Sequence, residues 1–348
     1  MTRQIHVGTV PVGGGAPVSI QSMCNTRTDD VAATAEQIRR LAAAGCEIVR
    51  VAVPDAAAAR AIGALKERSS LPIVADIHFD YKLALEAAAA GADKIRINPG
   101  NIGSADRVKA VADACRSRGI PIRIGVNSGS LEKRLLAQYG GVTAEAMVQS
   151  ALEQIEQLHR FDFEDICVSL KSSHVPLTIA ACRLLAERCD CPQHLGVTES
   201  GTPAMGIVKS AMGIGGLLCM GIGDTLRVSL TADPVEEVFA ARKILKAAGI
   251  RREGPDIISC PTCGRTKIDL IALAEETERR LANCTAPITV AVMGCAVNGP
   301  GEASAADYGI AGGDGEGVVF RRGQVVRKVS QDKLVDALLA LMEADGVL

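Results

Sequence analysis

Arginine recurs inside short apolar stretches of this sequence, where a charged side chain is unusual. The stretches are Val49-Arg50-Val51, Ile95-Arg96-Ile97, Ile122-Arg123-Ile124 and Leu226-Arg227-Val228, and Lys171 closes a further one. Burying a cation is costly unless an acid or a ligand faces it, and pairing with Asp76 or Glu199 is the ordinary explanation for one such residue. Two acids do not balance five cations. Because planar guanidinium groups match phosphate oxygens, the surplus predicts a site for a small, multiply charged anion such as a diphosphate.

Three cysteines near the C-terminus stand in a glycine-rich context. Cys260 and Cys263 belong to the run Cys-Pro-Thr-Cys-Gly, and Cys295 belongs to Gly294-Cys-Ala-Val-Asn-Gly-Pro-Gly-Glu302. Structural zinc usually takes four Cys or His ligands, often as two close pairs, but no histidine follows His194. A thioredoxin-like thiol pair would leave Cys295 unexplained. An iron–sulfur cluster with three thiolates and one other ligand fits the pattern best, since thiolate is the ligand that such clusters use.

The other cysteines and the histidines carry weaker signals. Apolar patterns surround Cys46, Cys115, Cys167, Cys182 and Cys219, which we expect to behave as small buried hydrophobic residues. Cys189 and Cys191 are expected to be structural, and His159, His174 and His194 to be structural or at the surface. His78 follows Asp76, so it is either a partner of that acid or a proton donor.

Strand-like and helical patterns alternate through the first 250 residues. Strands are predicted at 18–22, 47–53, 73–77, 94–97, 122–126, 165–170, 194–198 and 225–230, with helices at about 30–44, 55–68, 81–90, 104–118, 143–160, 175–189, 203–220 and 234–248. Eight such units in about 250 residues are typical of an α/β fold of the TIM (β/α)8 barrel type. An open, doubly wound sheet is the alternative, because periodicity does not show whether a sheet closes into a barrel. Such open sheets rarely have eight parallel strands in sequence, so the barrel is favoured.

The repeat ends near Gly254-Pro255, which divides the chain into residues 1–254, the barrel, and residues 255–348. The second part is predicted to be a small α+β iron–sulfur domain. A strand leads into Cys260, a helix spans about 267–283, and a strand at 288–292 leads into Cys295. A hairpin of 318–320 and 325–329 and a final helix from about 331 complete it.

Functional residues of a (β/α)8 barrel follow the C-terminal ends of its strands. In the predicted barrel these positions hold Arg50, Asp76, His78, Arg96, Asn98, Arg123, Asn127, Lys171, Thr198, Glu199, Arg227 and Ser229. We expect them to meet at one rim of the barrel and to form the anion site.

The composition excludes several classes of protein. Lys and Arg number 38 against 40 Asp and Glu, so the net charge of −2 argues against a nucleic-acid partner. Aromatic residues make up 2% and tryptophan is absent, which argues against a surface that stacks nucleic-acid bases and against an aromatic belt at a membrane. The N-terminus has no apolar core of a secretory signal, and the longest uncharged apolar run, 210–223, is interrupted by glycine and too short for a membrane span. A cytoplasmic protein without membrane contact is expected.

With these motifs in place, the chain resembles the 4-hydroxy-3-methylbut-2-enyl diphosphate synthases, iron–sulfur enzymes of the methylerythritol phosphate route to isoprenoids. The resemblance covers essentially the whole chain and rests on Gln21-Ser-Met23, Arg96-Ile-Asn-Pro-Gly-Asn101, Cys260-Pro-Thr-Cys-Gly-Arg-Thr266 and Gly294–Glu302. It implies a compact two-domain enzyme, a head-to-tail homodimer, and a [4Fe-4S] cluster held by Cys260, Cys263, Cys295 and Glu302. No Gly-x-Gly-x-x-Gly follows a strand, so flavodoxin or ferredoxin is the expected electron donor.

The resemblance also implies a substrate, 2-C-methyl-D-erythritol 2,4-cyclodiphosphate, which undergoes reductive ring opening and loses a hydroxyl as water. The residues expected to bind it are Arg50, Asp76, Arg96, Arg123, Asn127, Lys171, Thr198, Arg227, Ser229 and Asn298. Glu302 would be an exchangeable ligand, because a carboxylate is harder than thiolate, and Glu199 is the candidate acid, with His78 as the alternative. Cys24 departs from the Thr of similar sequences, next to the expected site.

Two other classes of function stay open at this stage. A similar barrel can transfer a one-carbon unit from a pterin, with the cysteine domain only structural. An iron–sulfur carrier is the non-enzymatic alternative. The arginines within strands argue against a carrier, and the motif around Cys295 argues against a structural zinc module.

Overall fold

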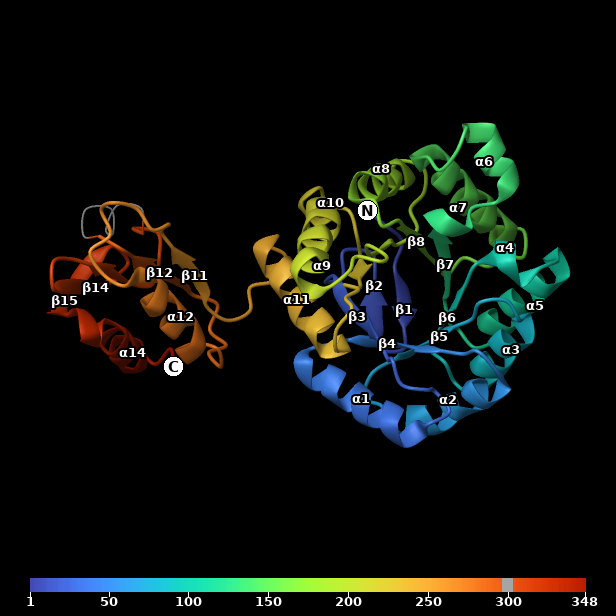
Figure 1. The fold of residues 1–348 in the computed structure, drawn as a ribbon. Coiled ribbons are helices and arrows are strands. Elements are labelled where there is room, and N and C mark those ends of the chain that lie inside the picture. Colours follow the sequence, from blue (N-terminus) through green and yellow to red (C-terminus); the bar gives the residue numbers. More distant parts are fainter. Residues whose placement is uncertain (296–302) are drawn as a thin grey trace. The chain divides into compact units, whose positions relative to one another are not determined.

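Eight parallel strands form a ring in the first part of the chain, and the connecting helices lie outside it (Figure 1). The strands are β3 (Ser19–Met23), β4 (Ile48–Ala52), β5 (Ile73–Asp76), β6 (Lys94–Ile97), β7 (Ile122–Asn127), β8 (Ile166–Lys171), β9 (His194–Leu195) and β10 (Thr225–Leu226). Consecutive strands from β3 to β8 pair with one another, and β10 pairs with both β9 and β3. A parallel bridge between Val168 and Gln193 joins β8 to the start of β9 and completes the ring. The predicted TIM barrel is confirmed, and the open sheet is wrong.

The structure is a computed structural model, and it describes residues 1–295 and 303–348. They form two compact units, Met1–Arg251 and Arg252–Leu348. No helix in these described ranges is long and apolar enough to cross a membrane.

Helices follow the barrel strands, and several of them begin at a residue whose side chain caps the first turn. They are α1 (Val31–Ala44), α2 (Ala56–Arg68), α3 (Tyr81–Ala89), α4 (Pro99–Ile102), α5 (Ala105–Arg116), α6 (Lys133–Tyr139), α7 (Ala144–His159), α8 (Val175–Ala186), α9 (Pro203–Ser210), α10 (Gly216–Cys219) and α11 (Pro234–Ala247). A π-helix, Ala211–Gly215, joins α9 to α10, and a 3-10 turn, Ser128–Ser130, follows β7. Asp30, Asp55 and Asp233 each accept a hydrogen bond from a backbone N–H in the first turn of their helix.

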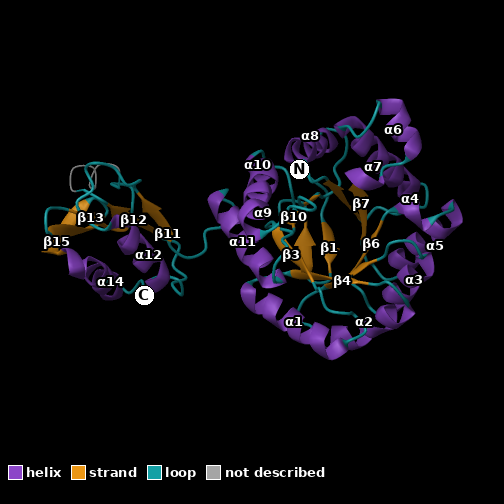
Figure 2. Ribbon diagram, in the orientation of Figure 1, coloured by secondary structure: helices purple, strands orange, loops and turns teal. Residues whose placement is uncertain are grey.

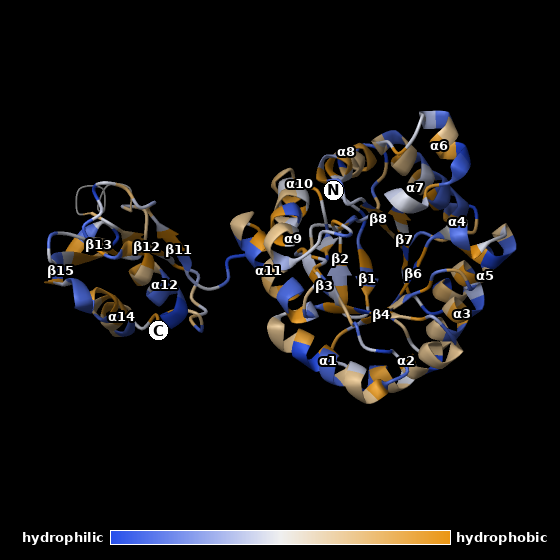
Figure 3. Cartoon of the chain, in the orientation of Figure 1, coloured by the Kyte–Doolittle hydropathy of each residue, from blue (hydrophilic) through white to orange (hydrophobic). Residues whose placement is uncertain are grey.

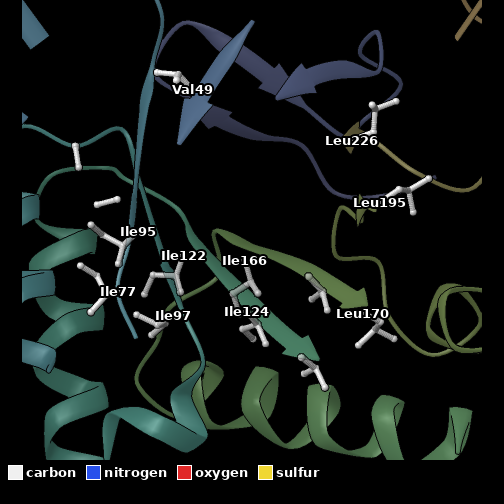
Figure 4. Close-up of a cluster of buried hydrophobic side chains, with 14 of the residues drawn as sticks. Val49, Ile77, Ile95, Ile97, Ile122, Ile124, Ile166, Leu170, Leu195 and Leu226 are labelled. Atoms are coloured by element: carbon white, nitrogen blue, oxygen red, sulfur yellow. The ribbon is translucent and has the colours of Figure 1, made fainter. Parts of the chain in front are cut away.

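Alternate residues of each strand point outward and pack against these helices. Ile95, Ile122 and Ile166 are fully buried in this layer, and Figure 4 shows them with their neighbours between strands and helices. In Figure 3 the surrounding helices are hydrophobic on part of their surface and hydrophilic on the rest, as amphipathic helices are. The main apolar core therefore lies outside the ring, which leaves the inward positions to other residues.

A short hairpin that the sequence did not reveal covers one end of the ring. Its strands are β1 (Ile5–Val7) and β2 (Val10–Val12), which pair antiparallel. Ile5, Val7 and Val12 pack with Ile48, Val74 and Cys167 from the N-terminal halves of barrel strands. Three-residue strands are too short for a periodic pattern, so only the packing identifies them.

The second unit contains a mixed five-stranded sheet among its described residues, with helices on one face (Figure 2). Its elements are β11 (Asp256–Ser259), α12 (Leu270–Arg280), β12 (Thr289–Met293), β13 (Tyr308–Gly312), β14 (Glu316–Arg321), β15 (Gln324–Ser330), a 3-10 turn (Gln331–Lys333) and α14 (Leu334–Ala344). β11, β12 and β13 are parallel to one another, whereas β14 is antiparallel to both of its neighbours, β13 and β15. The predicted α+β arrangement is confirmed, although β13 was missed because its sequence, Tyr-Gly-Ile-Ala-Gly, has two glycines and no alternation.

Candidate functional site

Polar and cationic side chains occupy the inward positions of the barrel, where most TIM barrels have bulky aliphatic ones. Arg50 on β4, Arg123 on β7 and Lys171 on β8 are only 8%, 1% and 8% exposed. Arg96 on β6 and Arg227, directly after β10, are partly buried beside them. Burial lowers the pKa of Lys171, and the positive charges of Arg123, Arg50, Arg227 and Arg96 lower it further. The five cations predicted from the sequence are thus gathered at one end of the barrel, which we call the mouth.

One buried acid serves two of these cations. The Asp76 carboxylate accepts a hydrogen bond from Arg96 Nη1 at 2.9 Å and lies 3.7 Å from Arg50 Nε. Burial raises the pKa of Asp76, but the charges of Arg50, Arg96 and Arg123 outweigh it and lower the pKa to about 2. Asp76 is therefore ionised throughout the neutral range and neutralises one positive charge of the mouth.

A second buried acid, which the sequence analysis missed, pairs with Arg227. Glu237 on α11 is 3% exposed, and its carboxylate accepts hydrogen bonds from Arg227 Nε at 3.2 Å and Nη2 at 3.1 Å. Ser22 Oγ and the Leu230 N–H also donate to it, at 3.2 and 3.0 Å. The expected partner, Glu199, is exposed and makes no ion pair among the described residues. The sequence did contain a signal for this buried acid. Glu237 lies on the apolar face of its helix, next to Val238 and four residues before Ala241, where an acid needs a buried partner.

Arg123 and Lys171 have no carboxylate within ion-pair distance in the described part of the chain. Nε and Nη1 of Arg123 also lack hydrogen-bond partners there. Burial lowers the pKa of Arg123 to about 10, and the charge of Arg96 contributes in the same direction. A buried cation without a partner is destabilising by itself, so these two residues are prepared for an anionic ligand.

Two glycines on inward positions make room for the cations. A Cβ on Gly125 of β7 would lie 2.6 Å from Arg96 Nε and 2.8 Å from its Nη2. A Cβ on Gly196, just after β9, would lie 2.8 Å from Lys171 Nζ. Met23 separates two guanidinium groups: its sulfur lies 3.0 Å from Arg50 Nη2 and 3.8 Å from Arg227 Nη1. Small and neutral residues thus determine where the charged groups lie.

Gly125→Ala should therefore weaken anion binding while the fold is retained. The added methyl displaces the Arg96 guanidinium from Asp76, and we expect about tenfold weaker binding of inorganic pyrophosphate, measured by calorimetry, from the loss of one charge-assisted contact of ~1.4 kcal/mol. Gly129→Ala is the matched control, because a Cβ there meets no atom within 4 Å. Equal affinity in the two variants would contradict the proposed arrangement of Arg96.

The remaining predicted residues surround the mouth at different depths. Asn127 ends β7 and is the Cα partner of Lys171, and Asn98 is buried. Thr198 is partly buried, and the Ser229 carbonyl accepts a hydrogen bond from Ser200 Oγ, which joins the two strand ends.

The two candidate acids are both exposed to solvent. Glu199 has a left-handed backbone, with φ of 51°, a conformation that is unusual outside glycine. His78 makes no hydrogen bond with Asp76 among the described residues, and its ring lies 6.2 Å from that of Phe79. The charge of His78 still contributes to the low pKa of Asp76, after those of Arg50, Arg96 and Arg123, so both alternatives for His78 stay predictions.

Two loops of the second unit bring the predicted metal-ligand cysteines to one edge of the sheet. Cys260 follows β11 directly, and Cys295 lies two residues beyond β12, with which β11 is parallel. The Gly294 N–H donates to Cys260 Sγ at 3.1 Å, and the Lys267 N–H donates to the Gly294 carbonyl at 3.1 Å. A Cβ on Gly294 would lie 3.1 Å from Thr266 Cγ2, so this glycine permits the close approach of the loops.

The chemistry of these thiols fits a metal cluster. Backbone N–H hydrogen bonding from Arg265, followed by the Arg265 side chain, lowers the pKa of Cys263, which favours the thiolate that binds metal. The Gly294 N–H lies against the sulfur of Cys260, an N–H···S contact of the kind found around cluster thiolates. Among residues 1–295 and 303–348, no three Cys, His, Asp or Glu side chains are grouped closely enough to hold a metal ion. Asn298 and Glu302, the other expected ligands of substrate and cluster, lie outside the described residues.

The other cysteines are mostly buried and unreactive. Cys24 is 5% exposed, and burial raises its pKa to about 12; its N–H donates to the Arg50 carbonyl, so it is next to the mouth but faces the core. Cys46, Cys115, Cys167 and Cys182 are buried as predicted. The prediction was wrong for Cys219, which is exposed at the end of α10.

Comparison with solved structures shows the barrel fold. A phospho-2-dehydro-3-deoxyheptonate aldolase of Thermotoga maritima superposes with a TM-score of 0.52 at 14% identity, over 72% of this chain and 75% of its own. Dihydropteroate synthase of Yersinia pestis gives a TM-score of 0.50 at 13% identity, over 72% of this chain and 100% of its own. At such identities the likeness shows the fold alone, and it does not favour pterin chemistry.

Sequence relatives cover nearly the whole chain. A protein of Geobacter sulfurreducens is 60% identical over 98% of this chain and 97% of its own, and one of Bacillus subtilis is 58% identical over 97% and 89%. Both are named 4-hydroxy-3-methylbut-2-en-1-yl diphosphate synthase (flavodoxin). The GcpE TIM-barrel domain matches residues 2–242, and the GcpE protein C-terminal domain matches residues 256–344. With both characteristic domains in order and these relatives, the chain belongs to the GcpE family.

Proposed function

We propose that this chain catalyses the reductive ring opening of 2-C-methyl-D-erythritol 2,4-cyclodiphosphate to 4-hydroxy-3-methylbut-2-enyl diphosphate. The reaction takes up two electrons and two protons and releases one water. The observation that carries the proposal is the pair of buried cations without an acid in the described residues, Arg123 and Lys171, in the mouth of the barrel. The whole chain is also 60% identical to a protein named for this product. A cyclic diphosphate is an anion of the size and charge that such a mouth would bind.

The mouth residues divide into two groups by their partners. Arg123 and Lys171 would bind phosphate oxygens without giving up an ion pair, so they would supply most of the binding energy. Arg50 and Arg96 share Asp76, which holds their guanidinium groups in place before the substrate arrives. Asn127 and Ser229 would donate hydrogen bonds to the bridging and hydroxyl oxygens. This pre-organisation lowers the entropy cost of binding.

Cys260, Cys263, Cys295 and Glu302 would hold a [4Fe-4S] cluster. When bound, the cluster would supply electrons and a Lewis-acidic iron for the departing oxygen. Glu199 would deliver the proton that converts the departing hydroxyl to water, and its exposure to solvent lets it be protonated again after each turnover. His78, also exposed, is the alternative donor at the same rim.

The partners belong to the same proposal. The relatives are named for a flavodoxin, which we take as the electron donor, and ferredoxin is the alternative. We also propose a head-to-tail homodimer, which the family resemblance implies, and a cytoplasmic location, which is the expectation from the sequence.

Iron content and turnover of anaerobically purified protein test this function. We expect brown protein with about four irons per chain, and formation of 4-hydroxy-3-methylbut-2-enyl diphosphate from the cyclodiphosphate with reduced flavodoxin. Colourless protein with stoichiometric zinc would exclude the cluster. Iron-loaded protein that neither binds nor turns over the cyclodiphosphate would favour the carrier, and binding of a pterin instead would favour one-carbon transfer.

A further inference from the structure

A set of buried polar side chains lies at the end of the barrel opposite the mouth. Ser19, Lys94, His194 and Thr225 are the first residues of β3, β6, β9 and β10, so they lie together at the N-terminal end of the parallel ring. With Gln21, two residues further along β3, they form what we call the floor set. Their exposed fractions are 1%, 0%, 1% and 0%, and that of Gln21 is 1%.

The floor set converges on the barrel axis. Thr225 is the Cα partner of both Ser19 and His194, so three neighbouring strands present these side chains at adjacent positions. β6, which carries Lys94, lies across the ring from β10, and the charge of Lys94 acts on His194. Below them, Val74, the Cα partner of Lys94, packs on the apolar residues of the N-terminal hairpin, which closes this end.

No protein group in the described part of the chain forms a hydrogen bond with the polar atoms of these side chains. Lys94 Nζ, both ring nitrogens of His194 and both amide atoms of Gln21 lack hydrogen-bond partners among the described residues, as do the hydroxyls of Ser19 and Thr225. Buried polar atoms in proteins are almost always hydrogen-bonded to protein, water or an ion. Seven such atoms in one place point to a bound species.

The charges around the floor set indicate whether the bound species is water or an ion. Lys94 is fully buried with no acid in ion-pair distance in the described ranges, and Asp76 at the mouth pairs with Arg50 and Arg96. Burial lowers the pKa of Lys94 to about 8, so the ammonium form is still the main one at neutral pH. Burial, followed by the charges of Arg123 and other cations, lowers the pKa of His194, so the imidazole is neutral and adds no charge. Water would complete the hydrogen bonds but would leave the ammonium group without a counter-charge.

We propose that the floor set binds a small inorganic monoanion of halide size, with the Lys94 ammonium group as its charge partner. The hydroxyls of Ser19 and Thr225 and the amide of Gln21 donate the remaining hydrogen bonds. The anion neutralises the floor of the barrel, which leaves Arg123 and Lys171 free to bind the ligand of the mouth. This site is separate from the proposed function, because it does not depend on which substrate the mouth accepts.

Crystals of the full-length protein grown in sodium bromide test the site directly. We expect an anomalous bromide peak beside Lys94 Nζ in the wild type, no peak in Lys94→Met, and an unchanged peak in Lys243→Met, an exposed lysine on α11. An ordered water in place of bromide in the wild-type crystals would overturn the proposal.

Solution measurements keep the proposal testable if Lys94→Met does not fold. Replacing gluconate with bromide at equal ionic strength should raise the unfolding midpoint of the wild-type barrel by roughly 4 °C, as expected for a ligand that binds only the folded state. Thr225→Val, which keeps the volume and removes one donor, should lose about half of this shift. A shift of equal size in the wild type and in Thr225→Val, together with equal bromide occupancy, would show that the floor set does not bind the anion.

Discussion

Arg123→Met will bind the cyclodiphosphate roughly 100- to 1,000-fold more weakly than the wild type and will unfold at a higher temperature. The loss of affinity follows because a buried charged contact to a ligand contributes ~3–4 kcal/mol. The gain in stability follows because Arg123 is 1% exposed and has no acid partner in the described residues, so an apolar side chain of similar length removes a desolvation cost of ~1–3 kcal/mol. Calorimetric titration and thermal unfolding measure the two effects.

Opposite signs for affinity and stability distinguish a ligand-binding cation from a structural one. Arg39→Met is the control, because Arg39 is exposed and, among the described residues, pairs only with Glu36 on its own helix. Neither quantity should change. Unchanged affinity in Arg123→Met, or a lower unfolding temperature, would show that the buried cation serves the fold and not the ligand.

Arg227 gives the contrasting case within the same mouth. Arg227→Met leaves Glu237 buried without its partner, so this variant should lose stability as well as affinity. The double variant with Glu237→Leu should regain most of the stability but none of the affinity.

Serine at Cys260, Cys263 or Cys295 will remove the iron and lower turnover by at least about 1,000-fold. Each thiolate holds one iron, and an oxygen ligand binds cluster iron far more weakly. Cys284→Ser is the control in the same unit: its Sγ lies 3.8 Å from the Val347 carbonyl, away from the cysteine loops. Iron analysis and turnover with reduced flavodoxin measure the result, and pyrophosphate binding should persist in all four variants because the cations belong to the other unit.

Two substitutions of Glu302 test whether this residue is an exchangeable ligand of the cluster or only a structural one. Glu302→Ala should assemble a cluster that is more sensitive to oxygen and turns over poorly. Glu302→Cys should give a sturdier cluster with four thiolates that accepts electrons but cannot take the substrate oxygen. Near-normal turnover in Glu302→Cys, with the fourth thiolate confirmed by spectroscopy of the reduced protein, would exclude ligand exchange at this position.

The sequence alone predicted the fold class and most of the residues that line the mouth. Period-two runs such as Ile95-Arg96-Ile97 place the isoleucines outward and the arginine inward, so both the core and the buried charge follow from local alternation. The cysteine loops were equally accessible, because short parallel strands before Cys260 and Cys295 bring the chain after each of them to one edge. The alternation within each strand, and the place of each cysteine directly after a strand, depend only on residues close together in the chain.

Only the tertiary structure showed which acids pair with the buried arginines and how the two ends of the barrel are built. Whether Arg227 pairs with Glu199 or Glu237 depends on the position of α11 relative to β3 and β10, which no local pattern contains. The same holds for the N-terminal hairpin, for closure between Val168 and Gln193, and for the floor set that converges from β3, β6, β9 and β10. Periodicity reports which face of its own element a residue occupies, whereas charge pairing depends on atoms that distant segments bring within about 4 Å.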